Sequence, residues 1–301
     1  MTLAFMDGVM PAITTPFTAD DRIDHEALDR QARWLMDARC TAIVALGSLG
    51  EVATLDADEK RALLRTVLRA GPQRPPVVAG VAALSTRDAV AAARMAADEG
   101  CAALMVLPPY VYSTDAREMQ AHVRAVIEAT PLPCILYNNP IAYRTDFLPW
   151  QVAELCARHA NLVAIKESSA DVRRLAALRA LLGPPLKLLM GVDDLIVEGI
   201  AAGATGWIAG LVDALPHESV RLFELARAGR WDEARALYEW FLPLLRLDTV
   251  PKFVQLIKLV QEMAGVGSAR VRAPRLALEG SELAEAQALI QRTLANRPLR
   301  G

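Results

Sequence analysis

The chain alternates short apolar runs with longer segments in which apolar residues recur every three or four positions. The short runs are typical of β-strands buried on both faces, and the longer segments are typical of amphipathic helices that cover them. Boundary signals support this division: Asp56 and Glu59 form the pattern of a capping box, Ser85 opens the third helix, and Gly100 closes it. The pattern predicts eight strands, at residues 9–14, 42–46, 77–81, 103–107, 134–137, 163–166, 187–190 and 206–208.

Each predicted strand is followed by a predicted helix. Eight such pairs in succession indicate an α/β protein, a closed (β/α)8 TIM barrel, in preference to an open doubly wound sheet. From about residue 216 the chain is mostly helical to its end. We therefore expect a barrel at residues 1–225 and an appended C-terminal helical region at residues 226–301, packed on the barrel as one structural unit. Apolar residues near helical spacing in the last region predict packing on the barrel and, in part, subunit contacts.

The composition narrows the class of ligand. The chain has 301 residues with 33 basic and 35 acidic side chains, no basic run and only 5% aromatic residues. We expect no nucleic acid and no membrane partner, but a small neutral or anionic molecule. The four cysteines form no C-x-x-C pair, and neither they nor the four histidines have the spacing of metal ligands. These counts predict a cytoplasmic protein without a metal.

One of the five lysines, Lys166, ends the predicted strand at residues 163–166, whereas Lys187 begins the next one. Active sites of TIM barrels lie at the carboxyl ends of the strands, so only Lys166 faces the catalytic mouth. Burial of an ammonium group lowers its pKa, which makes the neutral amine a nucleophile for imine (Schiff base) formation. The alternative is a lysine at the rim of the strand, with its stem on the core and its charge in water.

Other strand ends carry groups that imine chemistry needs. A phenol and a hydroxyl can move the proton that the carbinolamine must exchange when it loses water. The turn from Gly47 to Glu51 has exposed amides, and the Ser48 hydroxyl, that could hold a substrate carboxylate. The alternative for this turn is a strand-to-helix connection without a ligand. The groups at strand ends are Ser48, Glu51, Tyr110, Tyr112, Tyr137 and Gly191.

Five motifs, taken together, resemble the dihydrodipicolinate synthase and N-acetylneuraminate lyase family of class I aldolases. They occur in the family's order and spacing over essentially the whole chain. The resemblance implies the (β/α)8 barrel with a C-terminal helical region, independently of the strand count. The motifs are Gly8-Val-Met-Pro-Ala-Ile-Thr-Thr-Pro-Phe17, Gly47-Ser-Leu-Gly-Glu51, Tyr137-Asn-Asn-Pro140, Ile165-Lys-Glu167 and Gly191-Val-Asp-Asp194.

The resemblance also implies roles. Lys166 would form the imine with pyruvate or another 2-oxo acid, Tyr137 would be the acid/base phenol, and Ser48 would relay its proton. The amides around Ser48 and Leu49, with Gly47 beside them, would hold the substrate carboxylate. Gly191 and Ile208 would line the pocket through their backbone. No cofactor is implied beyond the covalent imine, and the family implies a homodimer or homotetramer.

The sequence departs from the synthase pattern at three places. Leu49 stands where the synthases have the second hydroxyl residue of the turn. Ala142 stands where they have the arginine that binds the aldehyde's carboxylate, and Arg144 follows two residues later. The tyrosine that would enter a neighbouring subunit's site aligns with Val111, between Tyr110 and Tyr112.

These departures favour a lyase of the aldolase or dehydratase/deaminase type that acts on pyruvate or a hydroxylated 2-oxo acid. Asn138 with Asn139, and Tyr143 with Arg144, would offer polar groups to such a substrate. One alternative is 4-hydroxy-tetrahydrodipicolinate synthase of lysine biosynthesis. Another is a non-catalytic small-molecule-binding barrel, which would not need a buried amine. A phosphate-handling barrel is disfavoured because Asp193 and Asp194 would repel phosphate.

Overall fold

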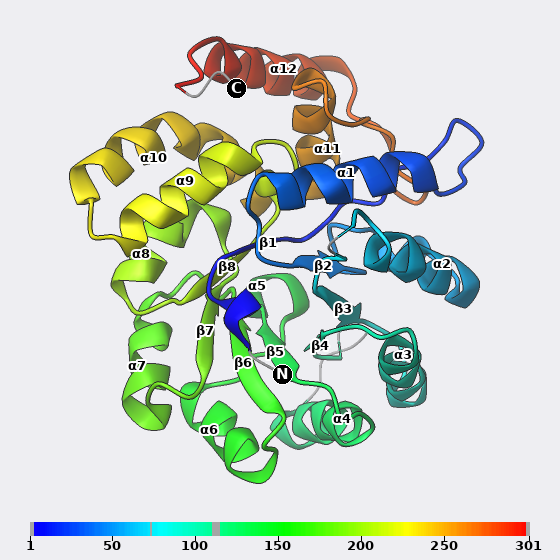
Figure 1. The fold of residues 1–301 in the computed structure, drawn as a ribbon, viewed down its shortest axis with the longest axis vertical. Coiled ribbons are helices and arrows are strands. Elements are labelled where there is room, and N and C mark those ends of the chain that lie inside the picture. Colours follow the sequence, from blue (N-terminus) through cyan, green and yellow to red (C-terminus); the bar gives the residue numbers. More distant parts are fainter. Residues whose placement is uncertain (1–2, 73, 110–114, 299–301) are drawn as a thin grey trace.

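The computed structural model describes residues 3–72, 74–109 and 115–298. Eight parallel strands form a ring in the order β1-β8-β7-β6-β5-β4-β3-β2, surrounded by helices (Figure 1). The prediction of a (β/α)8 barrel is confirmed. The strands are β1 (Val9–Pro11), β2 (Ile43–Ala45), β3 (Val77–Val81), β4 (Ala103–Val106), β5 (Cys134–Asn138), β6 (Leu162–Glu167), β7 (Lys187–Met190) and β8 (Gly206–Ala209).

The ring closes between β1 and β2 through a single bridge just beyond the end of β1. The Ala12 amide still donates to the Ala209 carbonyl of the β8 side at 2.8 Å, but the next amide, that of Ile13, donates to Val44 at 2.9 Å. We expected the first strand to continue to residue 14. It ends at Pro11, and the pairing beyond it is limited to the isolated bridge of Ala12 with Val44.

Helices follow the strands as predicted, with side-chain caps at several of their amino ends. Asp24 accepts from the Ala27 amide at 2.9 Å, and Asp56 with Glu59 forms the predicted capping box. The helices around the barrel are α1 (His25–Asp37), α2 (Ala57–Leu68), α3 (Thr86–Asp98), α4 (Ala116–Glu128), α5 (Pro140–Tyr143), α6 (Pro149–Arg158), α7 (Arg173–Leu182), α8 (Ile196–Ala201) and α9 (Pro216–Arg227). The one-turn helix α5 was not predicted.

The C-terminal helices α10 (Trp231–Leu245), α11 (Phe253–Met263) and α12 (Gly280–Ala295) lie together at one side of the barrel, next to α9 (Figure 1). Phe241, Ile257 and Ile290 are fully buried among them. The Trp240 indole donates to the Thr293 carbonyl at 2.9 Å and joins α10 to α12. In the parts of the chain that the structure describes, no helix has the length and apolar character of a membrane span.

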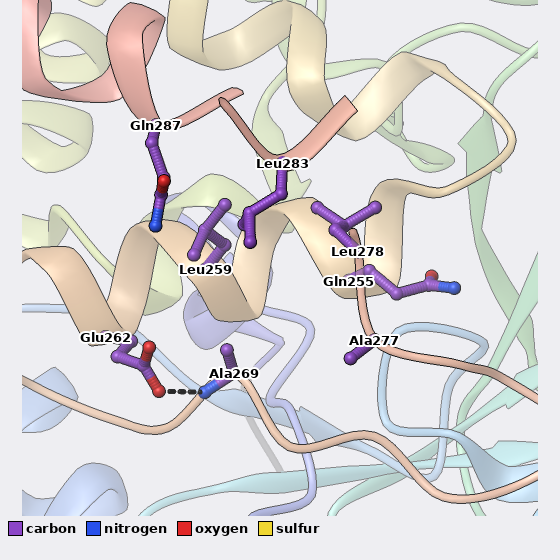
Figure 2. A pocket seen from close by; sticks show the side chains of 8 residues that line it. All are labelled: Gln255, Leu259, Glu262, Ala269, Ala277, Leu278, Leu283 and Gln287. Carbon is purple, nitrogen blue, oxygen red and sulfur yellow. Dashed lines mark hydrogen bonds between the residues drawn. The ribbon is translucent and has the colours of Figure 1, made fainter. Parts of the chain in front are cut away.

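A hollow of about 210 Å³ lies between α11 and α12 (Figure 2). At one end the Glu262 carboxylate accepts a hydrogen bond of 2.9 Å from the Ala269 amide. None of the predicted site residues lines this hollow, which is lined by Gln255, Leu259, Glu262, Ala269, Ala277, Leu278, Leu283 and Gln287.

Candidate active site

Lys166 and Tyr137 are direct partners in the parallel pairing of β6 with β5. Both lie at the carboxyl ends of their strands, and both are buried, with 7% and 6% of their surface exposed. Because they share a register position, their side chains leave the barrel wall side by side. The Lys166 Nζ lies 4.3 Å from the centroid of the Tyr137 ring.

Burial lowers the pKa of the Lys166 amine below its ordinary value. Interactions with Asp248, Tyr143 and Asp193 act in the opposite direction, but the loss of hydration is the larger effect. A lowered pKa increases the fraction of neutral amine, which is the form that attacks a carbonyl carbon.

Gly191 makes room for the Lys166 side chain. A Cβ at position 191 would lie 2.6 Å from the Lys166 Cε and 2.7 Å from its Cγ, and would also collide with the Ser168 hydroxyl. The Gly191 backbone is itself held on both sides, since its amide donates to the Glu167 carbonyl and its carbonyl accepts from Ser168, each at 3.0 Å. The lysine stem therefore runs across a position that only glycine fits.

The Tyr137 hydroxyl lies in a polar cluster. Burial is the main cause that raises its pKa, whereas interactions with Asn139, Ser168 and Tyr143 lower it. The Asn139 amide donates to the Tyr137 oxygen at 3.0 Å. The Tyr143 ring meets the Tyr137 ring edge-on, with centroids 5.7 Å apart and an interplanar angle of 85°.

Ser48 reaches this cluster through Tyr143, because the Ser48 Oγ and the Tyr143 hydroxyl are hydrogen-bonded to each other. Tyr143 thus lies between Ser48 and Tyr137. The sequence indicated Tyr143 only as a polar group for the substrate, and its place between these two side chains was missed. The short helix α5 carries Tyr143 into the mouth, and the Pro140 at its start was the only signal of that helix in the sequence.

The turn at residues 47–51 offers unused donors. Within the described ranges, the amides of Ser48, Leu49 and Gly50 have no acceptor. The turn begins and ends with left-handed residues, Leu46 at φ 60° and Glu51 at φ 55°. Unpaired amides at successive positions of a turn can form a concave site for an anion, so these donors are available to a carboxylate.

A buried ion pair holds this turn from the C-terminal side. The Glu51 carboxylate accepts from the Lys258 Nζ of α11 at 2.6 Å and from the Arg272 amide at 3.0 Å. Lys258 also donates to the carbonyls of Thr15 at 2.8 Å and Arg270 at 2.6 Å. Lys258 was missed in the sequence because its position within a helix carries no sign of a charged partner.

Asn138 is not available to a substrate, which corrects the prediction. It is fully buried on the outer side of β5, where its Nδ2 donates to Glu167 at 3.1 Å and to Asp146 at 3.2 Å. Its Oδ1 accepts from the Phe147 amide at 2.9 Å. Asn138 therefore joins the ends of β5 and β6 and supports their side chains from behind.

The remaining predicted site residues occupy different environments. Ile208 is buried in β8. A Cβ added to Gly47 would lie 3.7 Å from the Met105 side chain. Arg144 follows Tyr143, is exposed, and has φ 56°. Tyr110 and Tyr112 lie outside the described residues. Among those described, no cluster of histidine, cysteine and acidic side chains has the arrangement of a metal site.

Two buried aspartates follow β7 and β8, at the carboxyl ends of these strands. Asp193 accepts from the Trp207 indole at 3.0 Å and from the Leu211 amide at 2.8 Å, and burial raises its pKa to about 6. Asp213 accepts from the Thr14 amide at 3.1 Å, and burial raises its pKa well above the ordinary value. The sequence indicated Asp193 only as an argument against phosphate.

A closed parallel barrel with a buried amine beside a phenol, at the carboxyl ends of two neighbouring strands, is the arrangement of a Schiff-base-forming lyase. The sequence profile of the dihydrodipicolinate synthetase family matches residues 5–293. The chain therefore belongs to this family, and it is a class I lyase that acts on a 2-oxo acid through a Schiff base.

Known proteins support this assignment over nearly the whole length. The chain is 34% identical over 297 residues to a 4-hydroxy-tetrahydrodipicolinate synthase of Xanthomonas axonopodis pv. citri, covering 96% of this chain and 95% of that protein. A 4-hydroxy-tetrahydrodipicolinate synthase of Methylacidiphilum fumariolicum SolV superposes with a TM-score of 0.91 at 27% identity, covering 96% of each chain. A family member from an E. coli K12 prophage, solved with pyruvate, gives 0.88 at 26%, covering 96% of this chain and 98% of that one.

Proposed function

We propose that Lys166 is the amine that forms the Schiff base. The observation that carries this proposal is the pairing of Lys166 with Tyr137, which puts a buried amine against a buried phenol. The neutral Nζ attacks C2 of a 2-oxo acid, and the carbonyl oxygen takes a proton from the Tyr137 hydroxyl to give a carbinolamine. A proton then passes from the new C–N nitrogen to the hydroxyl through Tyr137, and the hydroxyl leaves as water. The protonated imine that remains withdraws electrons from the neighbouring carbon.

Tyr143 and Ser48 would return the proton to Tyr137. The contact of Ser48 with Tyr143, and the edge-on contact of Tyr143 with Tyr137, support a relay in this order. The substrate carboxylate would bind the unused amides of residues 48–50, with the Ser48 hydroxyl as a further donor. The turn would thus bind the carboxylate of the 2-oxo acid, and the Tyr137 phenol would contact its carbonyl oxygen.

The reaction that we favour is cleavage or elimination on a hydroxylated 2-oxo acid. Position 142 is an exposed alanine, so no side chain there can bind a second carboxylate. A substrate with hydroxyl groups beyond C3 does not need such a cation. The imine would then drive aldol cleavage, loss of water or loss of ammonia from the neighbouring carbons.

A second candidate is 4-hydroxy-tetrahydrodipicolinate synthesis, in which pyruvate condenses with an aldehyde that carries a carboxylate. The names of the relatives favour it. Arg144 is the nearest cation in the sequence to replace the absent arginine, and it is exposed. Incubation with pyruvate and aspartate semialdehyde tests this candidate directly, because the product forms only if the second carboxylate is accepted.

The test of the Schiff base is mass spectrometry of the intact protein after incubation with pyruvate and borohydride. We expect a reduced adduct that peptide mapping places on Lys166 and that Lys166→Ala abolishes. The matched control is Lys187→Ala, since Lys187 lies at the amino end of β7 in an ion pair with Asp7. An adduct that survives in Lys166→Ala, or none with any 2-oxo acid, would contradict the proposal and favour a non-catalytic binding barrel.

We also propose a cytoplasmic protein that assembles as a homodimer or homotetramer. All four cysteines are free thiols, and burial raises the pKa of Cys156 to about 11, so they are unreactive at neutral pH. The family resemblance supports the assembly. Light scattering coupled to gel filtration distinguishes a monomer of 32.6 kDa from two or four copies.

A further inference from the structure

Asp248 brings a carboxylate from the C-terminal region into the barrel mouth. It lies in the 3-10 turn η5 (Arg246–Thr249) that follows α10. A Cβ added to Gly210, just after β8, would collide with the Asp248 Oδ1 and would lie 2.7 Å from its Cγ. The carboxylate therefore sits directly over the carboxyl end of β8, on the same side of the barrel as Lys166.

The Asp248 carboxylate lies near the reacting groups. The charge of Asp248 raises the pKa of Lys166 and that of Tyr137. Asp193 and Asp213 are its acidic neighbours and raise the pKa of Asp248 in addition to burial, whereas Lys166 opposes them. A group on the substrate beyond the imine carbon would be close to this carboxylate.

Asp248 is the carboxylate of this group without a protein donor. Asp193 has donors from Trp207, Gly210 and Leu211, and Asp213 has the Thr14 amide. In the described residues, no hydrogen bond or ion pair reaches the Asp248 carboxylate, although the side chain is half-buried.

Arg246, the cationic residue nearest to Asp248 in the sequence, does not pair with it. The Arg246 guanidinium is directed to Asp194, at 3.5 Å. The Asp248 side chain is partly exposed at the mouth, so its carboxylate can accept a hydrogen bond from a group that enters the site.

We propose that Asp248 binds a hydroxyl or amine group of the substrate beyond its 2-oxo acid end. The inference rests on the proposed function and deepens it, because it selects among 2-oxo acids. Asp193 and Asp248 make this part of the mouth negative, and position 142 supplies no cation. The site therefore accepts a tail with donor groups and rejects a tail that ends in a second carboxylate.

Three probes separate these tails: pyruvate has none, 2-keto-3-deoxygluconate has a hydroxylated tail, and 2-oxoglutarate has a carboxylate tail. The quantity measured is the concentration of each that gives half-maximal borohydride trapping on Lys166. The variants are Asp248→Asn, which keeps the shape, and Asp248→Ala. The control is Asp232→Asn on α10, whose side chain is 97% exposed.

In both Asp248 variants we expect the half-maximal concentration of 2-keto-3-deoxygluconate to rise about tenfold or more, the effect of losing a hydrogen bond to a charged group. At a pH above the rising limb of the trapping rate for each protein, the value for pyruvate should stay within threefold, and that for 2-oxoglutarate should fall. The Asp232 variant should match the wild type for all three.

Equal changes for pyruvate and 2-keto-3-deoxygluconate, or no change for either, would overturn the role of Asp248 while leaving the Schiff base intact. Absence of any adduct in the wild-type protein would instead overturn the proposed function, and the role of Asp248 with it. The pyruvate adduct also shows that each variant is folded, so a loss confined to the hydroxylated probe is a loss of recognition.

Discussion

The stem of Lys166 crosses the Cα of Gly191 so closely that a Cβ there would lie 2.6 Å from the Lys166 Cε. The substitution Gly191→Ala must therefore displace the lysine, the Ser168 hydroxyl or the strand end. We expect the rate of pyruvate trapping to fall by about a hundredfold, as for other small misplacements of reacting groups. The double variant Ser168→Ala, Gly191→Ala removes only the hydroxyl collision, so recovery of the rate in it would show that the lysine stem is not the constraint.

The pH dependence of imine formation follows from two opposite pKa shifts. The reaction needs neutral Lys166 and protonated Tyr137, and burial lowers the pKa of the amine while it raises that of the phenol. The trapping rate should rise with pH through the lowered pKa of Lys166. It should fall only above the ordinary tyrosine pKa of about 10.

The charge of Asp248 gives this profile a further test. Asp248 raises the pKa of Lys166, so Asp248→Asn should lower it and move the rising limb to lower pH. The charge of Asp193, which also raises the pKa of this amine, remains in this variant. A limb that moves to higher pH would contradict the electrostatic assignment.

The contact between Ser48 and Tyr143 predicts that the two hydroxyls act as one relay. Tyr143→Phe should lower the rate of imine formation by about a hundredfold, which is the range of a single proton-transfer group. Ser48→Ala should cost a similar factor, and the double variant should cost little more than either, because members of one relay are not additive. Rates that multiply in the double variant would show two independent roles.

The buried pair of Lys258 and Glu51 predicts a large effect on stability. Lys258→Met leaves the Glu51 carboxylate buried without its ammonium partner, and we expect the free energy of unfolding to fall by about 3–5 kcal/mol in urea titration. The matched control is Lys252→Met, because the Lys252–Glu282 pair has side chains 51% and 45% exposed. That change should cost about 1 kcal/mol or less. Similar losses of unfolding free energy in both variants would show that burial of the pair does not cause the effect of Lys258→Met.

The barrel and the central pair of the site could be predicted because they follow from local pattern. Strand count and the position of Lys166 at the end of its strand need no knowledge of tertiary contacts. Asn138 could also have been judged correctly, since successive strand residues face opposite sides and Tyr137 already occupies the inner one. Its partner Glu167 follows Lys166 for the same reason.

Tyr143, Lys258 and Asp248 could not be found in this way. Tyr143 depends on one turn of helix, and the other two reach the mouth from a region that is more than 190 residues from Gly47 in the sequence. Nothing in a helical or turn segment indicates which distant loop it will meet. The division of the chain at residue 225 stays a prediction.

The buried ion pair between Lys258 and Glu51 limits which members of this family can be recombined. A chimera that takes its barrel from one relative and residues 226–301 from another would replace both the clamp on the carboxylate turn and the acidic side chain over β8 in one step. With the proposed role of Asp248, exchange of the C-terminal helices would change substrate preference. They can be exchanged productively only between parents in which a lysine and a glutamate occupy these two positions.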